Sequence, residues 1–362
     1  VANLWKPLFV EGVHIDFAYR TFRWDSEAKS KAHVHCVIIG FSIAANPAPR
    51  KLYDGERYQE VKNINGYLLD GENIFVESRN KPICDVPDIG IGNQPIDNGQ
   101  YLFEKDEMDS FLKIEPTAKP YFRLWYGSRE FINRKPRYCL WLGDCSPAEL
   151  RRMPECLKRV KSVKEYRAAS TRASTVKLSE RPTHFQTENM PSGTFILIPK
   201  VSSERRKYVP MGLMSPEVLC SDLVFIIPDT NLYHLGILTS NIHMAWMRAV
   251  CGRLKSDYRY SKDVVYNNFP WPDPTDAQKA KIEQTAQAIL DARALYPDSS
   301  LADLYDELTM PPELRKAHQN NDRAVMQAYG FDVKTTTESS CVAELMKLYQ
   351  QKVAELDAKK KN

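Results

Sequence analysis

The sequence predicts an α+β protein, with mixed α/β content, that contains more than one domain. Short apolar runs bounded by glycine and proline, GTFILIPK at 193–200 and DLVFIIPD at 222–229, have the length of buried strands. Beyond residue 273, long stretches such as 277–296 and 311–330 have helical patterns instead. A chain of 362 residues exceeds one small core, so two or three domains are expected.

The first 45 residues predict a helix followed by a β-hairpin. The segment 4–12 reads as a helix that ends at Gly12, and 14–24 and 32–42 are β-rich runs joined by the polar segment DSEAKSKA. Two strands and a helix do not form a core alone, so we expect the other strands of this sheet upstream of Val1. Because the chain begins with Val rather than Met, we interpret it as a fragment of a longer protein or a processed chain.

Residues 46 to about 120 predict a long, mostly irregular connector. Pro, Gly, Asn and Asp recur along it, while scattered Ile, Leu, Phe and Tyr indicate packing on a neighbouring surface. The best helix candidate within it is 102–116, LFEKDEMDSFLKIEP.

Residues 121–273 predict a mixed region. It begins with a strand at 137–144 and continues with a basic helix over 146–170, for which Ser146 is the expected N-cap. The two buried strands follow, and 231–254 is expected to begin as a strand and to continue as a helix from near Ser240.

Charge is distributed unevenly along the chain. Residues 52–119 contain 14 acidic and 7 basic residues, whereas 151–208 contain 14 basic and 5 acidic residues, a net charge of +9 against +4 for the whole chain. A basic segment of this kind suits a polyanionic partner, although such segments also occur as solvated faces.

Several functional classes lack their signatures here. No GxGxxG, Walker, GxSxG or HExxH motif is present, and no apolar run approaches the roughly 20 residues of a membrane helix. The eight cysteines are scattered without a CxxC pair, which disfavours a zinc site and fits reduced thiols in the cytoplasm. We therefore expect no metal and no membrane partner.

The hairpin RTFRWDSEAKSKAHVHCVIIGF, residues 20–41, resembles the last antiparallel hairpin of an adenine-N6 DNA methyltransferase of the MmeI-like (type IIL) restriction-modification enzymes. The resemblance implies that Phe22, with Trp24 beside it, stacks on an adenine that has been flipped out of the duplex. An aromatic face restores part of the lost stacking energy. The alternative is that both rings only pack within the hairpin.

A second segment, 244–274, resembles the end of the recognition domain in these methyltransferases, where GRLKSDYRYS precedes a YNxFPxP turn. Its donors and flat rings suit contacts with phosphates and sugar edges. The predicted backbone contacts are Arg253, Lys255, Tyr258, Arg259, Tyr260 and Ser261. Residues 266 and 269–272 are instead expected to form a rigid corner that closes the domain.

A third segment, KVSSERRKYVP at 200–210, resembles the strand from which MmeI-like enzymes read bases. Alternation along a strand would place Ser202, Glu204, Arg206 and Tyr208 on one face. A glutamate accepts from cytosine N4 and an arginine donates to guanine, so this face could read a C·G pair. The resemblance adds Thr171 and Arg172 as cooperating positions, while Lys200, Arg205 and Lys207 are predicted to hold the DNA backbone. The alternative is a surface ion pair between Glu204 and Arg206.

The resemblance extends from Phe17 to about Phe331 and implies an organisation for the whole chain. The predicted regions are the end of a Rossmann-like methyltransferase sheet (1–45), a connector (46–120), a target-recognition domain (121–273) and a C-terminal helical domain (274–362). The implied parent enzyme uses S-adenosylmethionine to methylate adenine N6 in a specific duplex and also carries a nuclease. The chain lacks the glycine-rich cofactor loop and the NPPY-type motif, so we expect no catalytic residue and no bound cofactor in it.

The expected partners are double-stranded DNA and the missing N-terminal nuclease and methyltransferase regions. Two alternatives come from other functional classes. An RNA-binding module could use the same basic and aromatic residues but would prefer single strands or A-form helices. A structural or partner-binding fragment would explain the connector and the tail but would leave the basic segment without a purpose.

Overall fold

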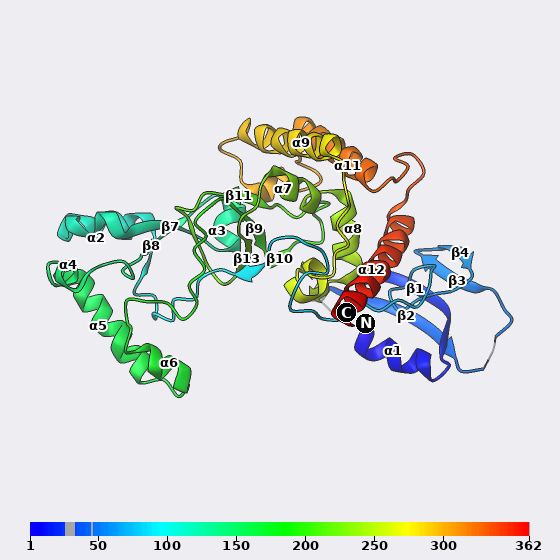
Figure 1. Ribbon diagram of the computed structural model, residues 1–362, viewed down its shortest axis with the longest axis horizontal. Helices are drawn as coiled ribbons and strands as arrows, with labels where there is room; N and C mark the ends of the chain where they lie inside the picture. Colours follow the sequence, from blue (N-terminus) through cyan, green and yellow to red (C-terminus); the bar gives the residue numbers. More distant parts are fainter. Residues whose placement is uncertain (26–32, 45, 362) are drawn as a thin grey trace.

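The computed structural model describes residues 1–25, 33–44 and 46–361 and has the mixed α/β fold that the sequence predicts. In Figure 1 the molecule is elongated, with one lobe at the left, a central body, two long helices above it, and the N-terminal sheet at the right. None of the helices in the described ranges is long and apolar enough to cross a membrane.

The N-terminal region contains the predicted helix and hairpin. Helix α1 (Ala2–Val10) precedes an antiparallel pair, β1 (His14–Asp25) and β2 (His33–Ser42). Residues predicted as irregular connector then add two strands, β3 (Arg50–Asp54) parallel to β1 and β4 (Arg57–Val61), giving the order β2-β1-β3-β4. The prediction of an irregular segment is therefore wrong here, because buried Leu52 and Val61 pack β3 and β4 onto the core of this region.

The left lobe is built on the sheet β12-β7-β8-β6. Its strands are β6 (Leu102–Phe103), β7 (Phe122–Tyr126), β8 (Arg137–Leu140) and β12 (Leu219–Cys220). Its helices are α2 (Lys105–Ile114), the 3₁₀ helix η1 (Pro116–Tyr121), α4 (Pro147–Arg151), α5 (Pro154–Ala168) and α6 (Ala173–Leu178). The predicted helix at 102–116 is confirmed as α2, and Ser146 caps α4 by accepting a hydrogen bond from the Glu149 N–H. The single basic helix predicted over 146–170 is divided in two because Pro154, which lacks an N–H, starts a new helix.

The central body contains the sheet β11-β9-β13-β5. Its strands are β5 (Gly90–Ile91), β9 (Phe195–Pro199), β11 (Gly212–Met214) and β13 (Val224–Ile227). Helices α3 (Ser128–Asn133), α7 (Leu232–Leu238) and α8 (Asn241–Val250) and the π-helical turn η2 (Lys262–Tyr266) lie around it. The two predicted buried strands are confirmed as β9 and β13. The strand predicted at the start of 231–254 is wrong: the Asn231 side chain accepts from the N–H groups of Tyr233 and His234 and thereby begins α7.

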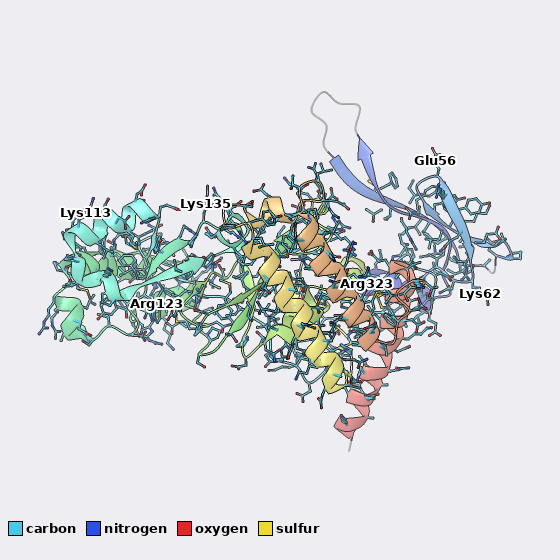
Figure 2. The ribbon with its side chains drawn as sticks, turned by 90° about the horizontal axis from the view of Figure 1, so that it is seen from above. Glu56, Lys62, Lys113, Arg123, Lys135 and Arg323 are labelled. Carbon is cyan, nitrogen blue, oxygen red and sulfur yellow. The ribbon has the colours of Figure 1, made fainter. Side chains whose placement is uncertain are left out.

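The C-terminal region is helical, as predicted. It contains α9 (Asp276–Ala294), the short α10 (Leu301–Leu304), α11 (Pro312–Ala328) and α12 (Glu338–Lys361). Figure 2 shows α9 and α11 side by side, and these two helices pack directly on each other. Helix α12 packs on α8 and buries Cys341, Leu345 and Tyr349 in the main core.

Candidate nucleic-acid interface

A three-stranded sheet brings together two of the segments that the sequence singled out. Strand β15 (Asp257–Arg259) pairs with β10 (Val201–Ser202) on one side and with β14 (Gly252–Leu254) on the other. The Tyr260 N–H also donates to the Lys200 carbonyl at 2.9 Å. The predicted base-reading segment and the predicted backbone-binding segment therefore lie side by side.

The chain turns immediately after β10. The Arg206 N–H donates to the Ser203 carbonyl at 3.1 Å, and the Arg205 N–H donates to the Ser203 side chain at 3.3 Å. We call Ser203–Lys207 the basic turn. The predicted strand over 201–210 is thus wrong beyond Ser202, because Ser203 holds the following residues in a turn, and the alternation of faces expected for a strand does not apply.

Two of the four residues predicted on the reading face are buried behind the basic turn. Ser202 is 3% exposed, and within the described ranges its hydroxyl has no hydrogen-bond partner. Tyr208 is 2% exposed; its hydroxyl donates to Asp322 at 2.7 Å, and its ring stacks on His318 with centroids 4.1 Å apart. Both side chains are therefore placed to support the basic turn from the interior.

Glu204 and Arg206 remain only half-buried in the basic turn. A carboxylate oxygen of Glu204 lies 4.0 Å from the Arg253 guanidinium, and the Glu204 N–H donates to Asp257 at 3.4 Å. Partial burial lowers the pKa of Arg206, while the nearby charges of Asp257 and Asp306 oppose that shift. Among the residues that the structure describes, none accepts a hydrogen bond from the Arg206 guanidinium.

Cations surround this small sheet. The Arg253 guanidinium lies 4.1 Å from the centre of the Tyr258 ring, and Lys200 lies 4.9 Å from that of Phe225. The exposed members of the predicted backbone set are Arg205, Lys207, Arg253, Lys255 and Arg259. The half-buried members are Lys200 and Ser261, and the buried ones are Tyr258 and Tyr260.

The two buried tyrosines have internal roles. The Tyr260 hydroxyl lies 2.9 Å from His243 Nε2, and burial lowers the pKa of His243 to about 3, so this imidazole is neutral at neutral pH. Tyr258 supplies the ring under Arg253. They position the cations and the strand rather than offering exposed donors.

Thr171 and Arg172 lie elsewhere. Both are exposed at the corner between α5 and α6, and Arg172 is the residue before α6. In Figure 1 α6 lies at the lower end of the left lobe, away from β10. The residues predicted to read bases therefore lie in two separate places, at the basic turn and on the left lobe.

Arg167 shows that the basic segment is not entirely a surface feature. It is fully buried and donates to five backbone carbonyls, those of Pro95, Ile96, Leu178, Arg181 and His184. It thereby ties α5 to the end of α6 and to two loops. Its helical spacing with buried Cys156, Val160 and Val163 is the sequence signal that could have identified it as internal.

The hairpin residues are only partly described. Phe22 is half-buried in β1 and pairs with Cys36 of β2. Trp24 lies in β1 opposite Val34, but its side chain is outside the described part, as is the connection 26–32. The stacking role for Phe22 and Trp24 stays a prediction.

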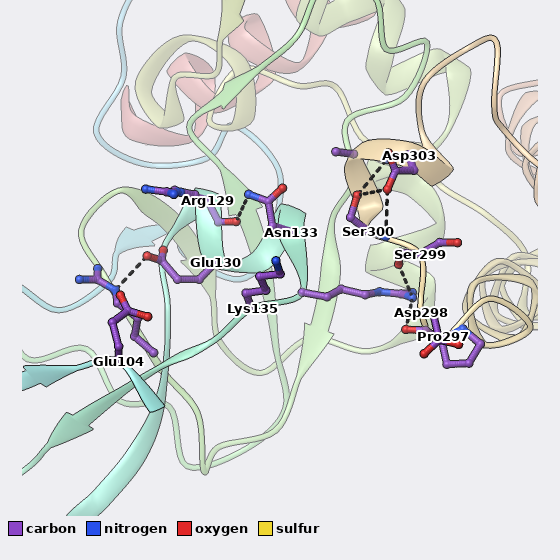
Figure 3. A pocket seen from close by; sticks show the side chains of 13 residues that line it. Glu104, Arg129, Glu130, Asn133, Lys135, Pro297, Asp298, Ser299, Ser300 and Asp303 are labelled. Atoms are coloured by element: carbon purple, nitrogen blue, oxygen red, sulfur yellow. Dashed lines mark hydrogen bonds and ion pairs between the residues drawn. The ribbon is translucent and has the colours of Figure 1, made fainter. Parts of the chain in front are cut away.

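A cavity of about 890 Å³ lies between the α3 region and the α9–α10 connection. Figure 3 shows Arg129, Glu130 and Asn133 on one side of it and Ser299, Ser300 and Asp303 on the other. Its lining mixes both charge signs, with Glu104, Glu130 and Asp303 beside Arg129, Arg134 and Arg137. Arg134 crosses the gap and donates to the carbonyls of Arg293, Tyr296, Pro297 and Ser299, so this region joins the central body to the C-terminal helices.

No group of three or more His, Cys, Asp or Glu residues that could hold a metal ion occurs within residues 1–25, 33–44 and 46–361. All eight cysteines are free thiols.

Family models match almost the entire chain. Residues 1–54 match the MmeI DNA-methyltransferase domain, 70–273 the MmeI target recognition domain and 274–357 the MmeI C-terminal domain. The chain belongs to the MmeI family. The small sheet with its basic turn lies within the region matched by the MmeI target recognition domain.

Two relatives agree with this assignment. The structure of the type IIL restriction-modification enzyme MmeI in complex with DNA matches 98% of the chain with a TM-score of 0.87 and 42% sequence identity. DNA methyltransferase A of Bacillus subtilis is 41% identical over 351 residues. The chain spans 48% of the length of that MmeI structure and 40% of the length of the B. subtilis protein.

Proposed function

We propose that this chain is the part of an MmeI-type restriction-modification enzyme that recognises a specific double-stranded DNA sequence. The observation that carries the proposal is the small sheet, which presents Glu204 and Arg206 on a turn and places exposed cations of 252–259 beside them. A related chain of 42% identity has been solved in complex with DNA, which supports the same ligand here.

The proposed contacts follow from exposure. Arg206 donates to a guanine edge and Glu204 accepts from a cytosine amino group, because both side chains lie in the basic turn and are partly exposed there. The exposed cations bind phosphates and give an affinity that falls with salt. Buried Ser202, Tyr208, Tyr258 and Tyr260 support these side chains. Thr171 and Arg172, on the left lobe, contact a separate part of the duplex.

We further propose that the parent protein methylates adenine N6 with S-adenosylmethionine. Residues 1–54 match the MmeI DNA-methyltransferase domain. The two glycines in this range are far apart in the sequence: Gly12 follows α1, and Gly40 lies in β2 facing the Phe17 ring. The glycine-rich cofactor loop is therefore expected in another part of the parent protein. Exposed Val37 and Phe41 lie on one face of β2 and exposed Ile38 on the other, so both faces of this strand offer apolar contacts to the rest of that domain. The free cysteines fit a reducing cytoplasm.

In this proposal Phe22 stacks on the flipped adenine. The test uses the full-length parent enzyme and a duplex with 2-aminopurine at the target position, whose fluorescence rises when the base leaves the stack. Phe22→Ala should change this signal on binding. An identical signal from the variant would remove the stacking role.

The DNA-recognition proposal is tested by selecting the chain against randomised duplex DNA at moderate salt and sequencing what remains bound. An enriched motif of several base pairs is the expected result. Retention without enrichment would contradict sequence recognition by this chain. Competition by single-stranded RNA stronger than by duplex DNA would favour the RNA-binding alternative, and salt-insensitive binding would favour a structural or protein-binding role.

A further inference from the structure

The end of the basic turn is tied to the C-terminal helices by a buried carboxylate. Asp322 of α11 is 7% exposed and uses both of its oxygens. One oxygen accepts from the Tyr208 hydroxyl at 2.7 Å, and the other accepts from the Asn241 N–H at 2.8 Å. Asn241 is the first residue of α8, so one side chain of α11 joins the basic turn to the N-terminus of α8.

A second buried group fixes the plane of the Tyr208 ring. His318, one helical turn before Asp322, stacks on that ring with an angle of 20° between the planes. Its Nε2 lies 2.9 Å from the Tyr305 hydroxyl, which accepts from Arg293 Nε at 2.7 Å. Arg293 also donates to the Met211 carbonyl at 2.6 Å. The chain is therefore held at Tyr208 and again three residues later.

A third contact holds the turn itself. Arg248 of α8 donates to both carboxylate oxygens of Glu338, at 2.7 and 2.9 Å, and to the Lys207 carbonyl at 3.1 Å. Glu338 is the first residue of α12. The last carbonyl of the basic turn is thereby joined to α8 and α12.

These contacts fix both the position of the basic turn and the direction in which its side chains point. Before the turn, β10 is fixed to β15 by strand pairing; at its end, Lys207 and the following Tyr208 are fixed to α8, α11 and α12. Only Ser203–Arg206 lies between the two anchors. Apolar packing tolerates small shifts, whereas hydrogen bonds of fixed geometry specify one position.

We propose that the C-terminal helices set the position of the base-reading side chains, with Asp322 acting as a positioning residue through Tyr208. The helices thereby influence which base pair is preferred as well as stabilising the fold. This inference rests on the proposed function, because it concerns how Arg206 and Glu204 meet the base edges.

The test measures the ratio of affinities for the selected motif and for random duplex, using the 362-residue chain and its variants. Tyr208→Phe removes only the hydroxyl and keeps the ring on His318, so it remains informative if Asp322→Ala fails to fold. Both variants should lower the ratio by about 2- to 30-fold. Their dissociation constants for random duplex, and the salt dependence of that binding, should stay unchanged.

Two further variants distinguish the positioning of the base-reading side chains from a general effect on the stability of the fold. Asp322→Asn should restore part of the ratio, since its amide can accept from the Asn241 N–H and donate to the Tyr208 oxygen. Tyr296→Phe is the matched control: it also removes a tyrosine-to-carboxylate hydrogen bond, the 2.8 Å contact with exposed Glu313. This control should leave the ratio unchanged.

The double variant Tyr208→Phe/Asp322→Ala should lose no more than the stronger single variant, because both act on one contact. An unchanged ratio in both single variants would overturn the inference while leaving the proposed function intact. Equal losses on the selected and random duplexes, after correction for the folded fraction, would also overturn it. Failure of the unmodified chain to enrich any motif would overturn the proposed function, and this inference with it.

Discussion

Replacing Arg206 with alanine is the most direct perturbation of base reading. Its guanidinium has no hydrogen-bond acceptor among the described residues, so its removal leaves no protein carbonyl unsatisfied. The cost to folding should stay within about 0.5 kcal/mol, as for other substitutions outside the core. A loss of DNA affinity can then be assigned to the contact with DNA.

The expected loss is specific to sequence. An arginine that donates twice to guanine contributes about 1–3 kcal/mol of discrimination, which corresponds to about 5- to 150-fold in affinity. Partial burial of Arg206 in the free protein favours the upper part of this range, because some of its desolvation has already occurred. Affinity for random duplex should change by less than about twofold.

Two neighbours in the same turn supply the controls. Arg205 and Lys207 carry the same charge but are exposed, so Arg205→Ala and Lys207→Ala should weaken binding to all duplexes alike. Each should also reduce the slope of log affinity against log salt by about 0.9. The assay is a fluorescence-anisotropy titration of the selected duplex, its single base-pair variants and a random duplex at two salt concentrations. Equal losses on selected and random DNA for Arg206→Ala would refute base reading by this residue.

Three other predictions concern the support of the site. Arg167→Met should lower the free energy of unfolding by about 3–5 kcal/mol, because five carbonyls lose their donor. Arg167→Lys keeps three donors, so its stability in urea unfolding should lie between that of the methionine variant and that of the wild type. A loss below about 1 kcal/mol for the methionine variant would contradict this role. Burial raises the pKa of Asp322 from 3.8 to about 6, so its contribution to stability is greatest below pH 4 and is lost as the pH rises through 6. The stability of the wild type relative to Asp322→Asn should therefore fall by about 3 kcal/mol between pH 4 and pH 7, and parallel pH profiles would show that the carboxyl is not perturbed. Lys255 has a φ of 56°, a backbone conformation that glycine adopts more readily than alanine. Lys255→Gly should therefore be more stable than Lys255→Ala by about 1 kcal/mol, while both variants lose DNA affinity equally. Equal stabilities in thermal unfolding would exclude backbone strain at this position.

The sequence predicted best where local signals and burial agree. Apolar runs ended by glycine or proline identified β9 and β13, and Ser146 and Ser240 identified the starts of α4 and α8. The sequence does not distinguish a strand from a helix at 231–238, because its apolar residues suit a buried strand or a buried helix equally; the capping hydrogen bonds of Asn231 favour the helix.

The site was predictable in composition but not in geometry. The sequence placed Glu204 and Arg206 beside each other in a basic segment, but the pairing of β10 with β15 joins residues more than fifty positions apart and leaves no local signal. A strand pattern places Tyr208 on the same face as Arg206 and therefore predicts a DNA contact for it. Its burial depends on Asp322 and His318, which approach only when α11 packs against the central body.

Helix α12 also bears on how the protein is made. Five of its residues, Cys341, Val342, Leu345, Met346 and Tyr349, belong to the main core, and the Tyr349 ring lies 5.9 Å from that of Trp246 in α8. Synthesis proceeds from the N-terminus, so α8 leaves the ribosome about a hundred residues before the helix that covers it. During this interval the apolar face of α8 is exposed to water or is covered by other proteins, such as chaperones. Translation that stops before residue 338 would yield a chain with α8 uncovered and Arg248 without Glu338, a species suited to aggregation and proteolysis rather than to DNA binding.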